Sequence, residues 1–344
     1  MELSKRKLRV LAVIVQTYIS TGEPVGSKSI ASELDASVSS ATIRNDMAEL
    51  TELGLILQPH TSAGRVPSQA GYRLYIDRLM NKSSISNTER SFIDEMISGD
   101  YGDPVKVLER ASVALAQLTN MAALATTPSS GENVVEHIEF LPVNRSNAII
   151  LVLTSGRVTK SKLCHFDFDV LPEHTEAFYK FAEKFIIGEQ LSKIDLPFIQ
   201  TMIKSVDEYT FSLIPVFMEL FDVIKEAGEA EIKLKGQTNL LMHPEFSPSR
   251  AHMLFDFLAQ RERIMSIIGR RGDGVSVVLG GEMDFSEMQG SSLLLAKYHT
   301  GNQSGSLGVI GPIRMDYAKL IPNLEYFAFK LGKLLSEINY SSLT

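Results

Sequence analysis

The sequence of 344 residues contains only one cysteine, Cys164, so no disulfide can form within the chain. This excludes the disulfide-stabilised class of small secreted domains and fits a reducing compartment. The sequence also has no run of 18 apolar residues, the length that a membrane-spanning helix needs. Four basic residues precede the apolar run 10–15, but that run is short and no small-residue cleavage site follows it. We therefore expect a cytoplasmic protein.

Motifs of enzymes and cofactor sites are missing too. There is no HExxH or GxSxG motif and no Cys/His pairing of the catalytic type. The stretch GRRGDG at 269–274 lacks the GxxxxGK[ST] pattern, and a strand is predicted after it where a phosphate-binding loop needs a helix. Its Arg270 and Arg271 have the charge to bind an anion, but a loop leading into a hairpin is the favoured interpretation. We expect no enzymatic activity and no cofactor.

A metal site is considered for CHFDFD at 164–169. On a strand, His165, Asp167 and Asp169 share one face and have the chemistry of metal ligands. The favoured alternative is an ordinary half-buried strand with polar residues outside and aromatic residues inside. No metal site is therefore predicted.

The charge of the chain is unevenly distributed. The formal net charge is −7, which argues weakly against nucleic-acid binding. Residues 1–80 nevertheless hold nine Lys and Arg against eight Asp and Glu, whereas the remaining residues hold 25 against 33. The N-terminal segment is thus the only part of the chain that a polyanion does not repel, and its charges can gather on one face.

Residues 1–80 show the pattern of a winged helix-turn-helix. Apolar residues at helical spacing predict a first helix that ends at Gly22, and Ser27 is expected to cap a second helix through Leu34. A third helix, capped by Ser39, is predicted to stop at Gly54. Strands at 55–57 and 64–67 form the predicted wing, and a fourth helix is predicted around 72–79.

Beyond residue 80 the pattern predicts an α+β multidomain chain. Ser86 and Glu89 have capping-box spacing, and Pro104 starts a helix predicted to reach about Ala125. Three strands from about residue 137, a helical block at 172–227 and further strands from 274 suggest a domain interrupted by an insertion. We predict four parts: 1–80, the DNA-binding domain; 81–103, a linker and short helix; 104–169 with 251–340, one α+β domain; and 170–250, a smaller inserted α+β domain.

The third helix carries an uneven polar face. With Ile43, Met47 and Leu50 on the buried face, the opposite face begins with small and hydrogen-bonding residues and places its carboxylates late. This gradient, together with the positive N-terminal end of the helix dipole, is typical of a recognition helix that enters the major groove N-terminus first. Arg44 can pair with a guanine edge or a phosphate, and Asn45 with an adenine edge.

Other candidate DNA contacts surround this helix. Short donors at its start and residues of the wing suit phosphate contacts, and three lysines on flanking helices add charge. The predicted set is Ser39, Ser40, Thr42, Arg44, Asn45, Lys28, His60, Thr61, Ser62, Arg65, Lys5 and Lys7. The alternative is a three-helix module whose polar face is only solvated, since many winged-helix modules bind protein instead.

Three long stretches of the sequence resemble the HrcA-type heat-inducible transcription repressors. They are SSATIRNDMAELTELGLI followed by HTSAGRVPSQAGYRLYID, then GQTNLLMHPEF, then SLGVIGPIRMDYAKLIPNLEYFA. The resemblance covers about residues 5–335. It implies a winged-helix domain, a GAF-like domain and an inserted dimerisation domain. It also implies a homodimer that binds an inverted-repeat DNA operator of chaperone genes and is kept active by the chaperonin GroEL.

Two other functions stay open at this stage. The first is a regulator that senses a small metabolite in the GAF-like domain, where Gly280, Gly281 and Glu282 near a strand end leave room for a ligand. A pocket filled by side chains is the alternative there. The second is a winged-helix module that docks onto protein.

Overall fold

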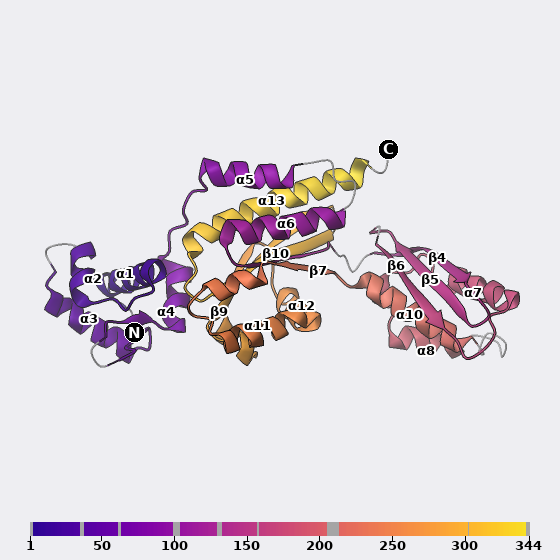
Figure 1. Ribbon diagram of the computed structural model, residues 1–344, viewed down its shortest axis with the longest axis horizontal. Coiled ribbons are helices and arrows are strands. Elements are labelled where there is room, and N and C mark those ends of the chain that lie inside the picture. The colour runs from indigo at the N-terminus through magenta and orange to yellow at the C-terminus, as the bar shows by residue number, and fades with distance from the viewer. Residues whose placement is uncertain are drawn as a thin grey trace. The chain divides into compact units, whose positions relative to one another are not determined.

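The computed structural model describes residues 3–34, 38–60, 63–98, 104–128, 133–156, 158–204, 213–301 and 303–341 (Figure 1). The chain forms two compact units. The first comprises Met1–Ala125, Lys233–Tyr298 and Ser306–Thr344, and the second comprises Thr126–Ile232 and His299–Gly305. None of the helices in the described ranges is both long enough and apolar enough to cross a membrane.

The N-terminal part of the first unit is a three-helix module with a short hairpin and a fourth helix. Its elements are α1 (Lys5–Thr21), α2 (Ser27–Leu34), α3 (Ser40–Glu52), β1 (Ile56–Leu57), β2 (Val66–Pro67), α4 (Gln69–Leu74) and the π-helix η1 (Tyr75–Leu79). β1 and β2 pair antiparallel. The predicted order of helices and wing strands is confirmed.

Local signals set the ends of these helices. Ser39 Oγ accepts a hydrogen bond from the Thr42 amide at 3.1 Å, as predicted for the cap of α3. Gly22 and Gly54, with φ of +72° and +69°, follow α1 and α3 in the left-handed conformation that favours glycine. Ser27 differs from its prediction, because it is the first residue of α2 and not its cap.

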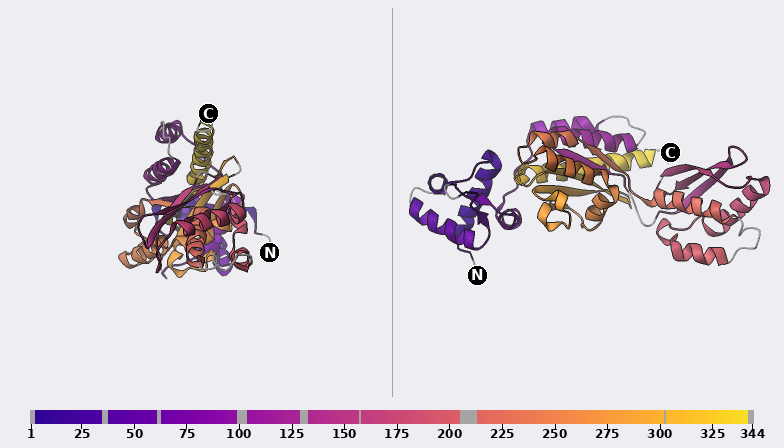
Figure 2. Two further views of the ribbon diagram at one scale, coloured as in Figure 1. Left: turned by 90° about the vertical axis from the view of Figure 1, so that its right-hand side faces the viewer. Right: turned by 60° about the horizontal axis from the view of Figure 1, so that its bottom comes forward.

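The rest of the first unit is built on a five-stranded sheet in the order β7-β3-β10-β9-β8. Helices α6 and α13 cover one face, with α5 packed on both, and α11 and α12 lie over the other face (Figures 1 and 2). The strands are β7 (Ile232–Lys235), β3 (Ala122–Thr126), β10 (Gln303–Pro312), β9 (Ser291–Thr300) and β8 (Val275–Leu279). The helices are α5 (Asn87–Ile97), α6 (Pro104–Thr119), α11 (Pro248–Ala259), α12 (Arg261–Gly269) and α13 (Tyr317–Ser341).

The start of α5 confirms a prediction, and the end of α6 corrects one. The capping box of Ser86 and Glu89 is present as expected. The helix that starts at Pro104 stops at Thr119 and does not continue to about Ala125, because Asn120 takes a left-handed conformation with φ of +53°. From Ala122 the chain forms β3, an interior strand between β7 and β10 whose five residues are all buried.

The second unit is a three-stranded antiparallel sheet covered on one face by helices. The sheet order is β4 (Val135–Pro142), β5 (Asn147–Thr154), β6 (Thr159–His165). The helices are α7 (Pro172–Phe185), η2 (Leu191–Lys193), α8 (Leu196–Lys204) and α10 (Ile214–Gly228). Phe140 of β4 stacks on Phe178 of α7 with ring centroids 4.7 Å apart, and Phe181 stacks on Phe217 of α10 at 3.9 Å.

This unit differs from the predicted division of the chain. The prediction grouped 104–169 with the C-terminal strands and confined the insertion to 170–250. In the structure the meander β4–β6 pairs only within itself, and the compact unit runs from Thr126 to Ile232. The reason is that the inward apolar face of the meander is covered by the phenylalanines of α7 and α10, which follow it in sequence.

The strand β6 also decides between the two interpretations of CHFDFD. It ends at His165, so Asp167 and Asp169 lie beyond the strand and do not share its face with His165. Cys164 and Phe166 are buried in the core of the unit, as in the favoured interpretation. His165 Nδ1 lies 3.0 Å from Asn147 Oδ1 on the neighbouring strand.

Candidate nucleic-acid interface

Helix α3 presents one buried and one exposed face. Ile43, Met47 and Leu50 are buried against α1 and α2, as predicted. The other face is exposed and consists of Ala41, Arg44, Asn45, Ala48, Glu49 and Glu52. Its first two turns therefore combine small side chains with two groups able to read base edges, which a groove floor can approach closely.

Arg44 is held only lightly in the free protein. Its side chain is exposed, and its Nε donates a hydrogen bond of 3.3 Å to Ser27 Oγ at the start of α2. Asn45 is exposed next to it, and Lys28 is exposed on α2. A long, solvent-accessible hydrogen bond of this kind contributes little stability, so the guanidinium is able to exchange Ser27 for a DNA acceptor.

Asp46 of α3 is a buried carboxylate. Its side chain is buried, and both carboxylate oxygens accept hydrogen bonds from Arg6 of α1, from Nε at 2.6 Å and from Nη2 at 2.9 Å. These hydrogen bonds raise the pKa of Arg6 above its usual value. The first carboxylate that α3 exposes is therefore Glu49, which forms an ion pair with Lys7. The spacing of residue 46 relative to Ile43 and Leu50 already places it on the buried face, which was the signal available in the sequence.

The wing contributes differently from the prediction. His60 is exposed, whereas Thr61 and Ser62 lie outside the described residues. Arg65 does not point from the wing tip, since its Nε donates to Thr51 Oγ1 of α3 at 3.2 Å and its backbone pairs with Val25. Arg65 therefore ties the wing to α3 through Nε, and its predicted contact with DNA falls to the terminal nitrogens of the guanidinium.

The remaining predicted residues lie at the start of α3 and on α1. Ser39 Oγ caps the helix and lies 2.9 Å from Thr42 Oγ1, so both hydroxyls are occupied with each other. Ser40 is half-buried beside them. Lys5 is exposed, while Lys7 is engaged with Glu49. The structure thus leaves Arg44, Asn45 and Lys28 exposed on α3 and α2, whereas Lys7 and Arg65 have partners inside the domain.

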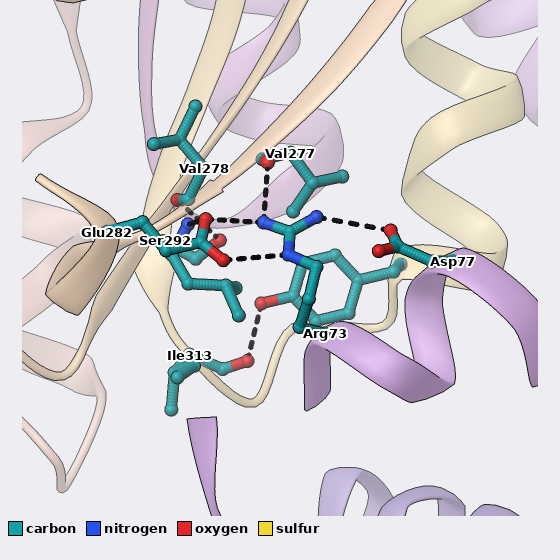
Figure 3. Close-up of polar contacts among 9 residues, drawn as sticks. Arg73, Asp77, Val277, Val278, Glu282, Ser292 and Ile313 are labelled. Atoms are coloured by element: carbon teal, nitrogen blue, oxygen red, sulfur yellow. Dashed lines mark hydrogen bonds and ion pairs between the residues drawn. The ribbon is translucent and has the colours of Figure 1, made fainter. Parts of the chain in front are cut away.

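Arg73 of α4 joins the winged-helix part to the five-stranded sheet (Figure 3). Its Nε and Nη2 donate to the two oxygens of Glu282 at 2.7 and 2.5 Å, and Nη2 also donates to the carbonyl of Val277 at 2.9 Å. Nη1 lies 3.3 Å from Asp77. Although burial opposes it, this pairing holds the pKa of Glu282 below its usual value. Bidentate geometry makes such a pair stronger than an ordinary surface ion pair.

The ligand room expected beside Gly280, Gly281 and Glu282 is filled. A Cβ on Gly280 would lie 1.7 Å from the carbonyl oxygen of Met288, and one on Gly281 would lie 2.1 Å from Gln69 Oε1. The carboxylate of Glu282 is bound by Arg73 and accepts a hydrogen bond from the Leu279 amide at 3.0 Å. The alternative of a site closed by side chains is the one found.

Comparison with known proteins identifies the family. Residues 2–78 match the profile described as "Winged helix-turn-helix transcription repressor, HrcA DNA-binding", and residues 105–321 match "HrcA protein C terminal domain". The heat-inducible transcription repressor HrcA of Acetivibrio thermocellus is 33% identical over 336 residues, which are 96% of this chain and 96% of that protein. The chain belongs to the HrcA family. HrcA proteins of Carboxydothermus hydrogenoformans and Clostridioides difficile are each 32% identical over nearly the full length of both chains.

HrcA membership explains why the N-terminal module carries the most specific sequence signal. The matched profile over 2–78 coincides with α1 through η1, and it is of the DNA-binding type. A solved structure titled "Crystal structure of a hypothetical protein at 2.2 A resolution" has a TM-score of 0.63 at 24% identity, covering 98% of this chain and 100% of that chain. That likeness supports the fold of this HrcA chain, a mixture of helices and sheets behind an N-terminal winged helix.

The joint between the winged helix and the sheet leads to a stability prediction. Tyr72 of α4 is buried, packs edge-to-face on Tyr317 and has a hydroxyl without a hydrogen-bond partner among the described residues. We expect Tyr72→Phe to leave stability unchanged or raise it by about 1–2 kcal/mol, because the cost of the buried, unpaired hydroxyl is removed. Urea unfolding followed by circular dichroism measures this change.

Tyr317→Phe is the matched control. The hydroxyl of Tyr317 donates a hydrogen bond of 2.6 Å to the carbonyl of Ile313, so its removal should cost about 1 kcal/mol. A larger loss of stability in Tyr72→Phe than in Tyr317→Phe would show that the Tyr72 hydroxyl has a partner that stabilises the fold.

Proposed function

We propose that this protein is a cytoplasmic, homodimeric repressor that binds an inverted-repeat operator of heat-shock chaperone genes through α3. The observation that supports DNA binding best is the exposed face of α3. Arg44 and Asn45 are presented there, while the buried carboxylate of Asp46 is neutralised by Arg6. The opening turns of α3 thus carry no exposed negative charge that would repel phosphates.

Within this proposal the predicted residues take three roles. Arg44 and Asn45 contact base edges in the major groove. Ser40, Thr42, Lys5, Lys28 and the wing residues His60, Thr61 and Ser62 contact the phosphate backbone, and Ser39 caps the helix. Lys7 contributes only after leaving Glu49, and Arg65 only through its terminal nitrogens, so we place them second in importance.

The outer face of the three-stranded sheet supports the dimer. Leu141, Ile149 and Leu163 pair side by side across all three strands, so they form one apolar row on the face opposite the buried core. Leu151 and Leu153 extend this row along β5. Leu163 is 64% exposed and Leu141 is 47% exposed. Apolar side chains are seldom grouped in this way on a surface that faces water. We call these five residues the apolar sheet face and propose that a second copy of the chain covers it.

A dimer of this kind fits an operator with two-fold symmetry. Two equal protomers bind an inverted repeat when their recognition helices are separated by about 34 Å, one turn of DNA, or a multiple of it. We also assign the five-stranded sheet and its helices to the GAF-like class that the family resemblance implies. In this arrangement that domain links the DNA-binding helices to the dimer contact.

Gel shifts across a salt series test the proposed function. We expect binding to a matched inverted repeat to fall steeply as salt rises, because the Lys and Arg side chains release counterions from the phosphates. A scrambled sequence of the same composition should bind much more weakly at every salt concentration. Equal affinity for the two probes would remove sequence-specific recognition and favour the protein-docking alternative.

The proposed role of the chaperonin GroEL comes from the family resemblance. The first unit exposes apolar side chains that a chaperonin can contact, among them Met242 at 77% and Phe329 at 67% exposure. We expect added GroEL to increase the fraction of protein that binds the operator, and an excess of an unfolded competitor to reverse the increase. An operator-binding fraction that does not respond to GroEL would contradict this part.

A further inference from the structure

A pocket of about 380 Å³ lies where η1 meets the five-stranded sheet. One wall is the π-helix η1 with Ile76 and Asp77, and the other walls are β8 and α13, with Val277 and Ile321. Arg271, near the start of the loop from α12 to β8, also lines it. The volume lies within the range of small-molecule sites in proteins.

Three cations and three carboxylates lie around this pocket, and one of the cations acts on them only through space. Arg73 is bound by Glu282 and Asp77, and Lys82 forms an ion pair of 2.6 Å with Glu325. In contrast, the Arg271 side chain forms no hydrogen bond or ion pair with the residues that the structure describes, although its Nε is buried. Arg271 as a whole is only half-buried and lines the pocket, so an anion there can form charge-assisted hydrogen bonds with the accessible part of its guanidinium.

Ser276 and five apolar residues complete the lining. Ile76, Met80, Val275, Val277 and Ile321 come from three different elements and surround the same space. A phosphate ion alone would leave these side chains facing water. An anion with a short hydrocarbon body would instead cover them and gain free energy from the buried apolar area.

The geometry of η1 contributes to the shape of the pocket. The Met80 amide donates to the carbonyl of Tyr75 at 2.8 Å, which is the wider π-type hydrogen bond of this helix. Such turns are rare and occur often at functional sites, because they cost stability that the surroundings must offset. Here the π-turn includes Ile76 and Asp77, both of which line the pocket.

We propose that this pocket binds a small organic monocarboxylate, with its carboxylate on Arg271 and its hydrocarbon body against the walls formed by η1, β8 and α13. This pocket is distinct from the filled site at Gly280. The loop GRRGDG contributes Arg271 to the pocket and does not act as a phosphate-binding loop. Because η1 closes the winged-helix module and β8 belongs to the sheet, the bound acid fastens these two parts to each other at the Arg73 joint.

Calorimetric titration of the full-length protein tests the binding. The probes are butyrate, hexanoate and benzoate, with 1-hexanol as the uncharged match of hexanoate and inorganic phosphate as the anion without a hydrocarbon body. We expect saturable binding of at least one carboxylate, and weaker binding of both 1-hexanol and phosphate. Arg271→Gln should weaken the carboxylate about tenfold or more, because a charge-assisted hydrogen bond is lost.

Arg270→Gln is the control, because Arg270 is the exposed neighbour of Arg271, lies outside the pocket lining and carries the same charge. It should bind the carboxylate as the wild type does. Binding of no carboxylate by the wild type, equal binding by Arg271→Gln and the wild type, or phosphate binding as tight as the best carboxylate would each overturn the proposal.

Hydrogen exchange provides a second readout that does not depend on DNA. With the best-binding acid, the amides of 75–82 and 275–278 should exchange more slowly, while those of α3 should not change. Unchanged exchange in 75–82 at saturating acid would contradict the proposed location. Both experiments use the free protein, so failure to bind a carboxylate and failure to bind an operator are separate results.

Discussion

Replacing Leu163 by aspartate is expected to convert the dimer into monomers and to weaken operator binding by about 10²- to 10⁴-fold. Leu163 is 64% exposed and pairs across β5 in one row with Ile149 and Leu141. A carboxylate at this position would be desolvated against the apolar surface of the partner protomer, so the dimer loses apolar contact and bears the cost of a buried charge. Sedimentation velocity measures the dimer, and a gel shift on the inverted repeat measures the affinity.

The matched control is Met218→Asp. Met218 is also an exposed apolar residue of the second unit, at 42%, but it lies on α10, and α10 packs against the sheet from the other side. We expect this variant to remain a dimer and to bind the operator normally. A monomeric Met218→Asp together with a dimeric Leu163→Asp would move the dimer contact from the sheet to the helices.

Arg44→Ala should reduce operator affinity by about 1–3 kcal/mol and relax specificity at one base pair of each half-site. The exposed guanidinium has only the hydrogen bond of 3.3 Å to Ser27, so its loss should hardly change the stability of the fold. A panel of operators with single base changes, measured by fluorescence anisotropy, shows whether one position has lost its preference.

Lys28→Ala is the comparison for a phosphate contact. It should weaken all sequences about equally and lower the slope of affinity against salt by about one. If Arg44→Ala behaves in this same uniform way, Arg44 contacts phosphate and the base preference comes from another residue. Arg6→Ala should change the stability of the fold and not the base preference. It removes the partner of the buried Asp46 but leaves the exposed face of α3 as it is.

Local structure in the winged-helix part could be predicted closely from the sequence. The cap at Ser39, the stops at Gly22 and Gly54 and the buried positions of α3 all depend on residues within one or two helical turns. The prediction for the helix that starts at Pro104 was wrong at its end, because the apolar pattern continues beyond the last residue of the helix. Residues 122–125 fit a helix by apolar content, but they form part of β3 because they pair with β10 inside the sheet.

The roles of individual polar residues depended on long-range contacts. The spacing of Asp46 places it on the buried face of α3, but the sequence does not show that Arg6, 40 residues away, neutralises it there. Arg73 was not among the predicted functional residues, since its partner Glu282 is 209 residues away. The hydrophobic period and the spacing of residues show which face of a helix or strand a residue occupies. They do not show which side chain from a distant part of the chain packs against that face.

The sequence by itself determined the order of the elements, the winged helix and the resemblance to the HrcA family, because caps, turns and hydrophobic period are short-range properties. The tertiary structure decided where the inserted unit begins, which face of its sheet stays apolar and exposed, and which distant carboxylates pair with Arg6 and Arg73. These features arise when segments far apart in the chain pack together, so burial and charge pairing exist only once the fold has formed.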